Sequence, residues 1–150
     1  MRIYEKVVIH APCEVVWDYI ADPDNYPDFM VGLTKWEIEG ERRNGLGARY
    51  RVLIRVGAAD VGGLIEIVEW KPGRDMALNS VTGVDQRARW RLRKVRENST
   101  RVEFHYSYGV AGGGVAGLIA ERLAARQLRR HLKGTLSKLK HLVEGQPAPV

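Results

Sequence analysis

Two carboxylates are candidate catalytic groups because each interrupts an apolar face. Glu66 shares one face of a β-like stretch with Val68 and Trp70, and Glu121 falls in the apolar stripe of a C-terminal helix. A carboxylate facing an apolar cavity is costly unless it is paired, so its pKa should rise or it should contact a ligand. Such a group could take a proton from the carbon next to a carbonyl. A bulge that turns Glu66 outward, or a frayed first helical turn around Glu121, would make each residue structurally ordinary.

The other reactive side chains are not placed to form a catalytic or metal site together. His10 and His105 lie in β-like stretches, and His131 and His141 are ten positions apart on the C-terminal helix, too far for one metal ion. Cys13 opens a helix, where a thiolate can be activated, but no His or Asn is placed to complete a triad. We therefore interpret Cys13 as a small buried residue and expect neither a metal nor a cofactor.

The bulk properties are those of one globular domain. The chain has 150 residues, of which 45% are hydrophobic and 28% charged. We expect a single domain over residues 1–144 and a frayed tail over residues 145–150. No stretch reaches the roughly 20 apolar residues that cross a bilayer, and no apolar segment near the N-terminus marks the chain for secretion. With one cysteine there can be no internal disulfide, so we expect a cytoplasmic protein.

The net charge of +6 is concentrated in one segment. Between Gly114 and Glu144 there are seven basic and two acidic residues, which leaves the rest of the chain nearly balanced. Four of the basic residues form a stripe along the predicted helix: Arg122, Arg126, Lys133 and Lys140. Two interpretations of this stripe stay open, a solvated flank and a surface that docks on anionic lipid headgroups.

Alternation of apolar and polar residues predicts a sheet over most of the chain. We expect seven strands, at residues 2–10, 34–39, 48–56, 63–70, 75–81, 86–95 and 101–108. A helix should cover residues 14–20, with a short second helix or turn in residues 22–27, and the chain should end in a helix of roughly 28 residues. Short turns between the strands indicate an antiparallel sheet with one solvated face.

Arginine ladders on these strands suggest nucleic-acid binding at first sight. Hairpin pairing, however, places Glu37 and Glu39 across from Arg49 and Arg51, and it places Arg89 and Arg91 near Glu103. Opposite charges that face each other across strands are usual on a solvated sheet face. The aromatic residues alternate to the other face, so there is no basic and aromatic platform for single strands. We do not expect a nucleic-acid partner.

Several stretches together resemble one superfamily over the whole chain. They are IHAPCEVVWDYIAD from Ile9, NYPDF from Asn25, the turns Gly45-Leu-Gly and Lys71-Pro-Gly, and LSKLKHLVE from Leu136. The chain resembles the START-like helix-grip superfamily (SRPBCC), especially its polyketide cyclase/dehydrase and lipid-transport branch. The resemblance implies an α+β helix-grip fold: a seven-stranded curved antiparallel sheet wrapped on a long C-terminal helix, with two short helices after strand one.

The same resemblance implies an apolar cavity between sheet and helix. The helix supports this arrangement, because Leu118, Ala125, Leu128, Leu132, Leu136, Leu139 and Val143 fall within one stripe at 100° per residue. We expect a cavity of at least several hundred cubic ångströms. The residues that should contact its ligand are Tyr26, Phe29, Met30, Trp36, Tyr50, Val52, Ile54, Trp70, Trp90, Phe104, Tyr106, Tyr108, Leu118, Glu121, Ala125 and Leu128. Tyr26, Phe29 and Met30 either form a lid over the cavity or fill the end of the core.

Two functions are consistent with this architecture. The first is binding or transport of a hydrophobic small molecule, such as a lipid, an isoprenoid or a polyketide-like compound. The second is a polyketide aromatase/cyclase-dehydratase. In the enzymatic branch, the resemblance implies an inward Arg on the strand before the Lys71-Pro-Gly turn, where this chain has Trp70. Without that cation nothing strong stabilises a developing enolate, so binding is the preferred hypothesis, with Glu66 and Glu121 as the catalytic candidates of the alternative.

Overall fold

The computed structural model describes residues 2–109 and 114–145, with side chains over residues 2–109 and 122–145. A seven-stranded antiparallel sheet has the order β1-β7-β6-β5-β4-β3-β2. Its strands are β1 (Arg2–Ile9), β2 (Leu33–Glu39), β3 (Arg49–Val56), β4 (Ala59–Lys71), β5 (Asp75–Ser80), β6 (Gln86–Arg96) and β7 (Ser99–Tyr108). The helices are α1 (Cys13–Ala21), the 3-10 turn η1 (Pro23–Asn25), α2 (Tyr26–Phe29) and α3 (Gly114–Glu144). The predicted fold class, a helix-grip fold, is confirmed.

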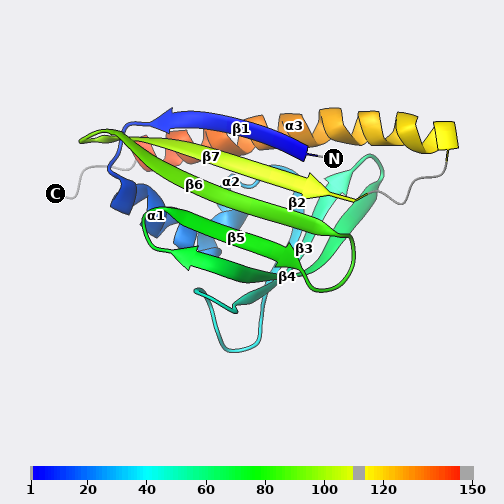
Figure 1. Ribbon diagram of the computed structural model, residues 1–150, viewed down its shortest axis with the longest axis horizontal. Coiled ribbons are helices and arrows are strands. Elements are labelled where there is room, and N and C mark those ends of the chain that lie inside the picture. Colours follow the sequence, from blue (N-terminus) through cyan, green and yellow to red (C-terminus); the bar gives the residue numbers. More distant parts are fainter. Residues whose placement is uncertain (1, 110–113, 146–150) are drawn as a thin grey trace.

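The long helix α3 runs beside β1 and β7 at the edge of the sheet, and α1 and α2 lie near the end where α3 finishes (Figure 1). It has 31 residues and is therefore about 46 Å long. Its apolar stripe faces the sheet: Leu128, Leu132, Leu136, Leu139 and Val143 are all buried. The predicted stripe is correct over these positions. Leu118 and Glu121 belong to the stretch of α3 whose side chains lie outside the described residues.

The main difference from the predicted boundaries is the start of β4. This strand begins at Ala59 rather than at Gly63. Val56 pairs with Ala59, which leaves Gly57 and Ala58 as a two-residue turn between β3 and β4. This stretch is rich in small residues, so a prediction based on alternating apolar side chains did not detect the first residues of the strand. The turn of this longer hairpin contacts the first half of α3, where the backbone N–H of Gly57 donates to the side-chain oxygen of Gln127.

One end of the sheet–helix interface is solidly packed, and we call it the closed end. It is defined by Ile9, Val16, Ile20, Phe29 and Leu139, each of which is fully buried. The chain is also tied together here by polar contacts. The carboxylate of Glu144 accepts from the backbone N–H of His10 at 2.9 Å. Because aliphatic and aromatic side chains from four elements meet at this end, it forms the main core of the domain.

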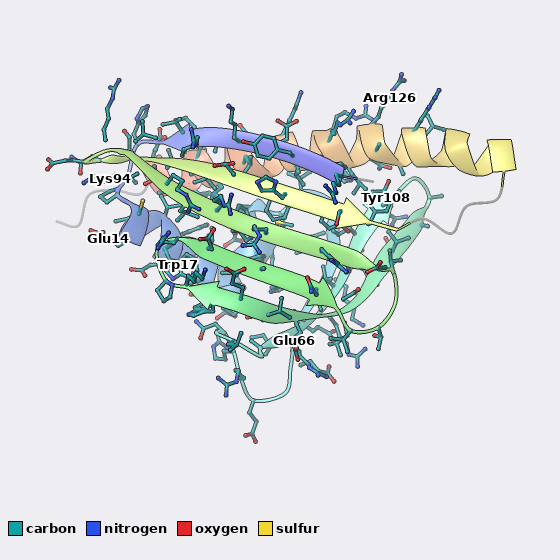
Figure 2. All side chains as sticks on the ribbon, in the orientation of Figure 1. Glu14, Trp17, Glu66, Lys94, Tyr108 and Arg126 are labelled. Carbon is teal, nitrogen blue, oxygen red and sulfur yellow. The ribbon has the colours of Figure 1, made fainter. Side chains whose placement is uncertain are left out.

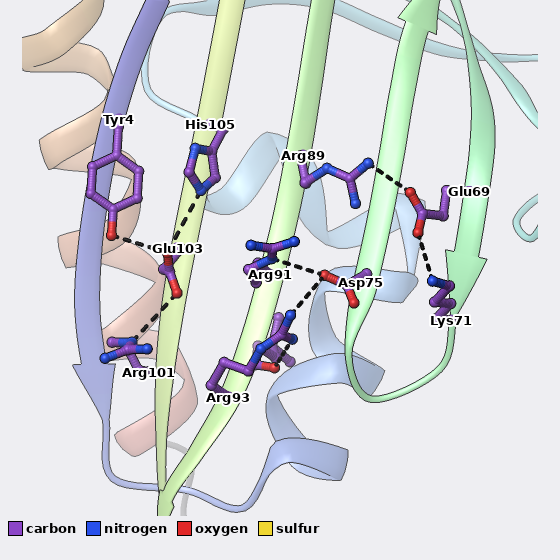
Figure 3. A network of polar contacts seen from close by, with 11 residues as sticks. Tyr4, Glu69, Lys71, Asp75, Arg89, Arg91, Arg93, Arg101, Glu103 and His105 are labelled. Carbon is purple, nitrogen blue, oxygen red and sulfur yellow. Dashed lines mark hydrogen bonds and ion pairs between the residues drawn. The ribbon is translucent and has the colours of Figure 1, made fainter.

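The outer face of the sheet carries paired charges (Figure 3). Arg51 pairs with Glu39 at 2.7 Å, and Arg89 pairs with Glu69 at 2.7 Å. The arginine ladders therefore face carboxylates across strands, as the sequence predicts. Arg91 lies opposite Glu103 in register, as expected, and it forms its ion pair with Asp75, at 3.3 Å.

Candidate functional site

A narrow space lies between the sheet and α3, and we call it the inner cavity. Its volume is about 60 Å³. Its walls come from α2 and the segment after it, from β2 to β7, and from α3. The lining residues are Tyr26, Met30, Val31, Trp36, Val52, Ile54, Ile65, Leu78, Gln86, Ala88, Trp90, Phe104, Tyr106, Leu128, His131, Leu132 and Thr135.

A larger space, which we call the outer hollow, lies beside the first half of α3. Its volume is about 490 Å³. It is lined by Ile54, Val56, Gly57, Val61, Gly62, Val84, Tyr106, Tyr108, Gly109, Leu123, Ala124, Gln127 and Leu128. Leu123 on its wall is 61% exposed, so the hollow opens to solvent. Ile54, Tyr106 and Leu128 line both spaces and form the partition between them.

The inner cavity is much smaller than the several hundred cubic ångströms expected, because aromatic rings fill the interior. Trp36 is stacked between Tyr26 and Tyr50, with ring centroids 4.6 and 4.7 Å apart. Trp90 packs on Phe104 with a centroid distance of 4.4 Å. Of the two spaces between the sheet and α3, it is the outer hollow that has a volume in the usual range for small-molecule sites.

The polar ends of the stacked rings point to the protein backbone. The indole N–H of Trp36 donates to the carbonyl of Pro23 at 2.8 Å, and the hydroxyl of Tyr50 donates to the carbonyl of Arg43 at 2.6 Å. Burial raises the pKa of Tyr50 to about 12 and also raises the pKa of Tyr26. Both phenols therefore stay protonated at neutral pH. Together these rings give the inner cavity a rigid and mostly apolar wall.

One polar pair lies on the cavity wall. The hydroxyl of Tyr106 donates to the side-chain oxygen of Gln86 at 2.7 Å. Gln86 is only 5% exposed, and its amide nitrogen has no hydrogen-bond partner among the described residues. Burial raises the pKa of Tyr106, so this hydroxyl keeps its proton. Sequence reasoning missed Gln86, although a signal was present: it occupies an inward position of β6, in alternation with Ala88 and Trp90.

A strap formed by Val31 and Gly32 crosses from α2 to β2 and is held against α3. The backbone N–H of Val31 donates to the hydroxyl oxygen of Thr135 at 2.9 Å. The ring N–H of His131 donates to the carbonyl of Arg55 at 3.0 Å, and the same ring lies directly on Gly32. Sequence reasoning did not place His131 or Thr135 at the cavity. No local pattern links them to residues about 100 positions earlier in the chain.

The predicted ligand-contact residues are distributed over both spaces and the core. Nine of them line the inner cavity: Tyr26, Met30, Trp36, Val52, Ile54, Trp90, Phe104, Tyr106 and Leu128. Tyr108 lines the outer hollow at the end of β7, where Figure 2 labels it. Leu118 and Glu121 lie outside the described side chains.

Four of the predicted residues line neither space. Phe29 is fully buried in the core against the rings of Tyr26 and Trp90, so it fills the closed end. Tyr50 lies behind Trp36 and is shielded by it from the inner cavity. Trp70 packs edge-on against Trp17, with ring centroids 5.0 Å apart. Ala125 is buried on α3 away from both linings.

Of the two orientations that the sequence leaves open for Glu66, the structure shows the outward one. Glu66 lies directly opposite Arg49 in register, and the two side chains form an ion pair at 2.8 Å on the outer face. A bulge between Ile67 and Glu69 shifts the register of β4. Because of this shift Trp70 points inward although Glu66 points outward, so the simple alternation of the sequence does not hold across the strand.

The basic stripe also differs from expectation at one position. Arg122, Arg126 and Lys133 are exposed, and Figure 2 shows Arg126 projecting away from the body of the molecule. Lys140 is engaged, since its ammonium group donates to the carbonyl of Val8 and to the carboxylate of Glu144, each at 2.6 Å. None of the described helices combines the length and the apolar character needed to cross a membrane. Within the described residues, no three His, Cys, Asp or Glu side chains gather to hold a metal ion.

Comparisons with known proteins give one family and one fold. The family model for polyketide cyclase/dehydrase and lipid transport matches residues 1–144. Nothing among the curated protein sequences matches the chain significantly. A protein of known structure from Thermus thermophilus is 18% identical, with a TM-score of 0.84, and the match covers 99% of this chain and all of the other.

Two further solved structures have names that state an activity or a superfamily. The Zhui aromatase/cyclase from a Streptomyces species is 21% identical, with a TM-score of 0.66, and the match covers 97% of this chain and 92% of the other. A START superfamily protein from Mycobacterium smegmatis is 15% identical, with a TM-score of 0.73, and the match covers 97% and 99% of the two chains. At these identities the likeness establishes the fold.

Proposed function

The chain belongs to the polyketide cyclase/dehydrase and lipid transport family, and from this premise we propose that it binds or transports a hydrophobic small molecule between the sheet and α3. The body of the ligand occupies the outer hollow, and one end reaches past Ile54, Tyr106 and Leu128 toward the inner cavity. A lipid, an isoprenoid or a polyketide-like compound has the required apolar character.

The observation that carries this proposal is the chemistry of the walls. Among the described lining residues of both spaces there is no Asp, Glu, Lys or Arg. Apolar side chains dominate, and the outer hollow has the volume of an ordinary small-molecule site. Transfer of an apolar ligand from water to such a surface is favourable, because apolar area is removed from water.

The alternative function, a polyketide aromatase/cyclase-dehydratase, is favoured by the name of one structural neighbour. That chemistry needs a group that takes a proton and a group that stabilises the enolate. Among the described lining side chains neither a carboxylate base nor a cation is present, since Glu66 pairs with Arg49 on the outer face. Binding is therefore the better-supported function.

The test is to fill the outer hollow. Ala124 lies on its wall, so Ala124→Phe should weaken binding of the neutral dye N-phenyl-1-naphthylamine at least about tenfold, since the new ring occupies the ligand's space. Ser137→Phe, which adds an exposed ring to the same helix, is the matched control and should bind the dye like the wild type. Native mass spectrometry of the purified protein would identify a co-purified ligand. Equal dye binding by the wild type and Ala124→Phe would contradict the proposed site.

We infer further that the rim of the hollow approaches anionic membranes during ligand exchange. Exposed Leu123 lies on the wall of the hollow, next to exposed Arg122 and close to Arg126 on the same helix. Vesicles of phosphatidylserine and phosphatidylcholine should therefore bind the protein at low salt and release it at high salt. Equal affinity for purely phosphatidylcholine vesicles, or no affinity for either, would leave the arginines as a solvated flank.

A further inference from the structure

The unpartnered amide of Gln86 is a feature of the inner cavity that hydrophobic binding does not explain. Gln86 opens β6 and is 5% exposed. Its backbone N–H is fixed by the hydroxyl oxygen of Ser80 at 3.2 Å, and its side-chain oxygen accepts from Tyr106 at 2.7 Å. The amide nitrogen, with two N–H donors, has no partner among the described residues.

The orientation of this amide follows from its hydrogen bond to Tyr106. Turning the amide over would place its nitrogen against the phenol oxygen and would leave the amide oxygen without a donor. It would also deprive the Tyr106 hydroxyl of the acceptor that it now uses. The observed orientation leaves fewer groups unsatisfied, so the N–H donors of Gln86 are the free ones.

Other polar groups on the same wall are already engaged. The imidazole of His131 donates to the carbonyl of Arg55, and the hydroxyl oxygen of Thr135 accepts from Val31. A buried donor without an acceptor is unfavourable, and native proteins pair nearly all such groups. The N–H donors of Gln86 thus form a position for one acceptor atom on a mostly apolar wall.

We propose that Gln86, oriented by Tyr106, is a specificity residue that recognises a carbonyl oxygen at one end of an apolar ligand. This inference rests on the proposed binding function. A carbonyl oxygen accepts from the amide and brings no hydrogen that needs an acceptor in return. The inner cavity of about 60 Å³ has room for such a group, and the outer hollow of about 490 Å³ has room for the apolar body.

The experiment compares two probes that differ in one atom group. 2-Acetylnaphthalene carries a ketone, and 2-isopropenylnaphthalene has a CH₂ group in place of the ketone oxygen. Each is titrated against bound N-phenyl-1-naphthylamine, and the ratio of the two affinities is the readout. In the wild type we expect the ketone to bind about five- to tenfold more tightly, the usual worth of one hydrogen bond to a neutral group.

Three variants separate recognition from packing. Gln86→Met keeps the length of the side chain but removes the donors, so the affinity ratio should fall to about one. Tyr106→Phe frees the amide to rotate and should lower the ratio without abolishing dye binding. Leu46→Met changes an exposed apolar residue that is not among the lining residues of either space, with little change in volume, and it should leave the ratio at the wild-type value. Circular dichroism establishes that each variant is folded.

Each outcome decides one of the two proposals. A wild-type ratio near one, or a ratio that persists in Gln86→Met, overturns the role of Gln86 while dye binding stands. Displacement of the dye by neither probe also overturns the inference alone. If the wild type does not bind the dye at all, the proposed function fails and the inference fails with it. Should Gln86→Met not fold, the wild-type ratio and Tyr106→Phe still test the proposal.

Discussion

The two ends of the sheet–helix interface use the same elements in opposite ways. At the closed end, Val16, Phe29 and Leu139 are fully buried and belong to the hydrophobic core. At the outer hollow the same helix and sheet meet over Gly57, Gly62 and Ala124. Small residues there leave unfilled volume that large residues occupy at the other end. Stability should therefore depend mainly on the closed end and ligand binding on the hollow.

The largest effect expected from this comparison is on stability. Leu139→Ala at the closed end should lower the free energy of unfolding by about 3 kcal/mol, because it removes a fully buried side chain and leaves a cavity. The same substitution at Leu123, which is 61% exposed on the rim, should change stability by no more than about 0.5 kcal/mol. Urea unfolding of both variants measures the difference. Similar losses at the two positions would remove the distinction between the two ends.

The strap between the ends should give the next largest effect. Gly32 has a φ of +87°, and a Cβ there would lie 2.6 Å from the ring of His131. Gly32→Ala should therefore destabilise the protein by about 1–3 kcal/mol. Part of this loss is steric, so adding His131→Ala to Gly32→Ala should cost less than His131→Ala costs alone. A double-mutant cycle by urea unfolding measures this coupling, and strictly additive losses would contradict it.

Ligand binding should connect the two ends thermodynamically. Free N-phenyl-1-naphthylamine at ten times its Kd should raise the free energy of unfolding by about 1.4 kcal/mol, because only the folded state binds it. Leu139→Ala should keep this increment although its basal stability is lower, whereas Ala124→Phe should lose the increment although its basal stability is preserved. Thermal unfolding with and without the dye measures both. Loss of the increment in Leu139→Ala would mean that the closed end also shapes the binding site.

The smallest effect concerns the outer face, which belongs to neither end. Hydrogen bonds from Arg89 and Lys71 hold the pKa of Glu69 below the ordinary glutamate value of 4.5. A carboxyl whose pKa is lowered by folding stabilises the folded state above its unfolded pKa, and that contribution is lost as the pH falls through the folded pKa. Glu69→Gln should therefore show a shallower loss of stability than the wild type as the pH falls below about 4.5. Exposed Glu41→Gln is the control, and it should follow the wild-type curve.

Most of the fold could be predicted from the sequence because its signals are local. Alternation in Tyr50-Arg51-Val52 and in Arg89-Trp90-Arg91 assigns each residue to a sheet face wherever the strand is regular. The turn residues between strands favour hairpins, and the 3.6-residue spacing of leucines identifies the face that α3 buries. Each of these patterns depends on neighbours within a few positions, so tertiary structure was not needed to interpret them.

The candidate site was decided by contacts between distant residues. The bulge in β4 turned Glu66 outward. Stacking of Tyr26, Trp36 and Tyr50 reduced the volume of the inner cavity to about 60 Å³. The amide N–H donors of Gln86 are free because the hydroxyl of Tyr106, on the neighbouring strand, donates to the side-chain oxygen of Gln86. Where a strand is regular, the sequence determines which side chains face inward. Only the tertiary structure decides how they fill the shared space, because packing and hydrogen bonding depend on atoms that the chain brings together only when it folds.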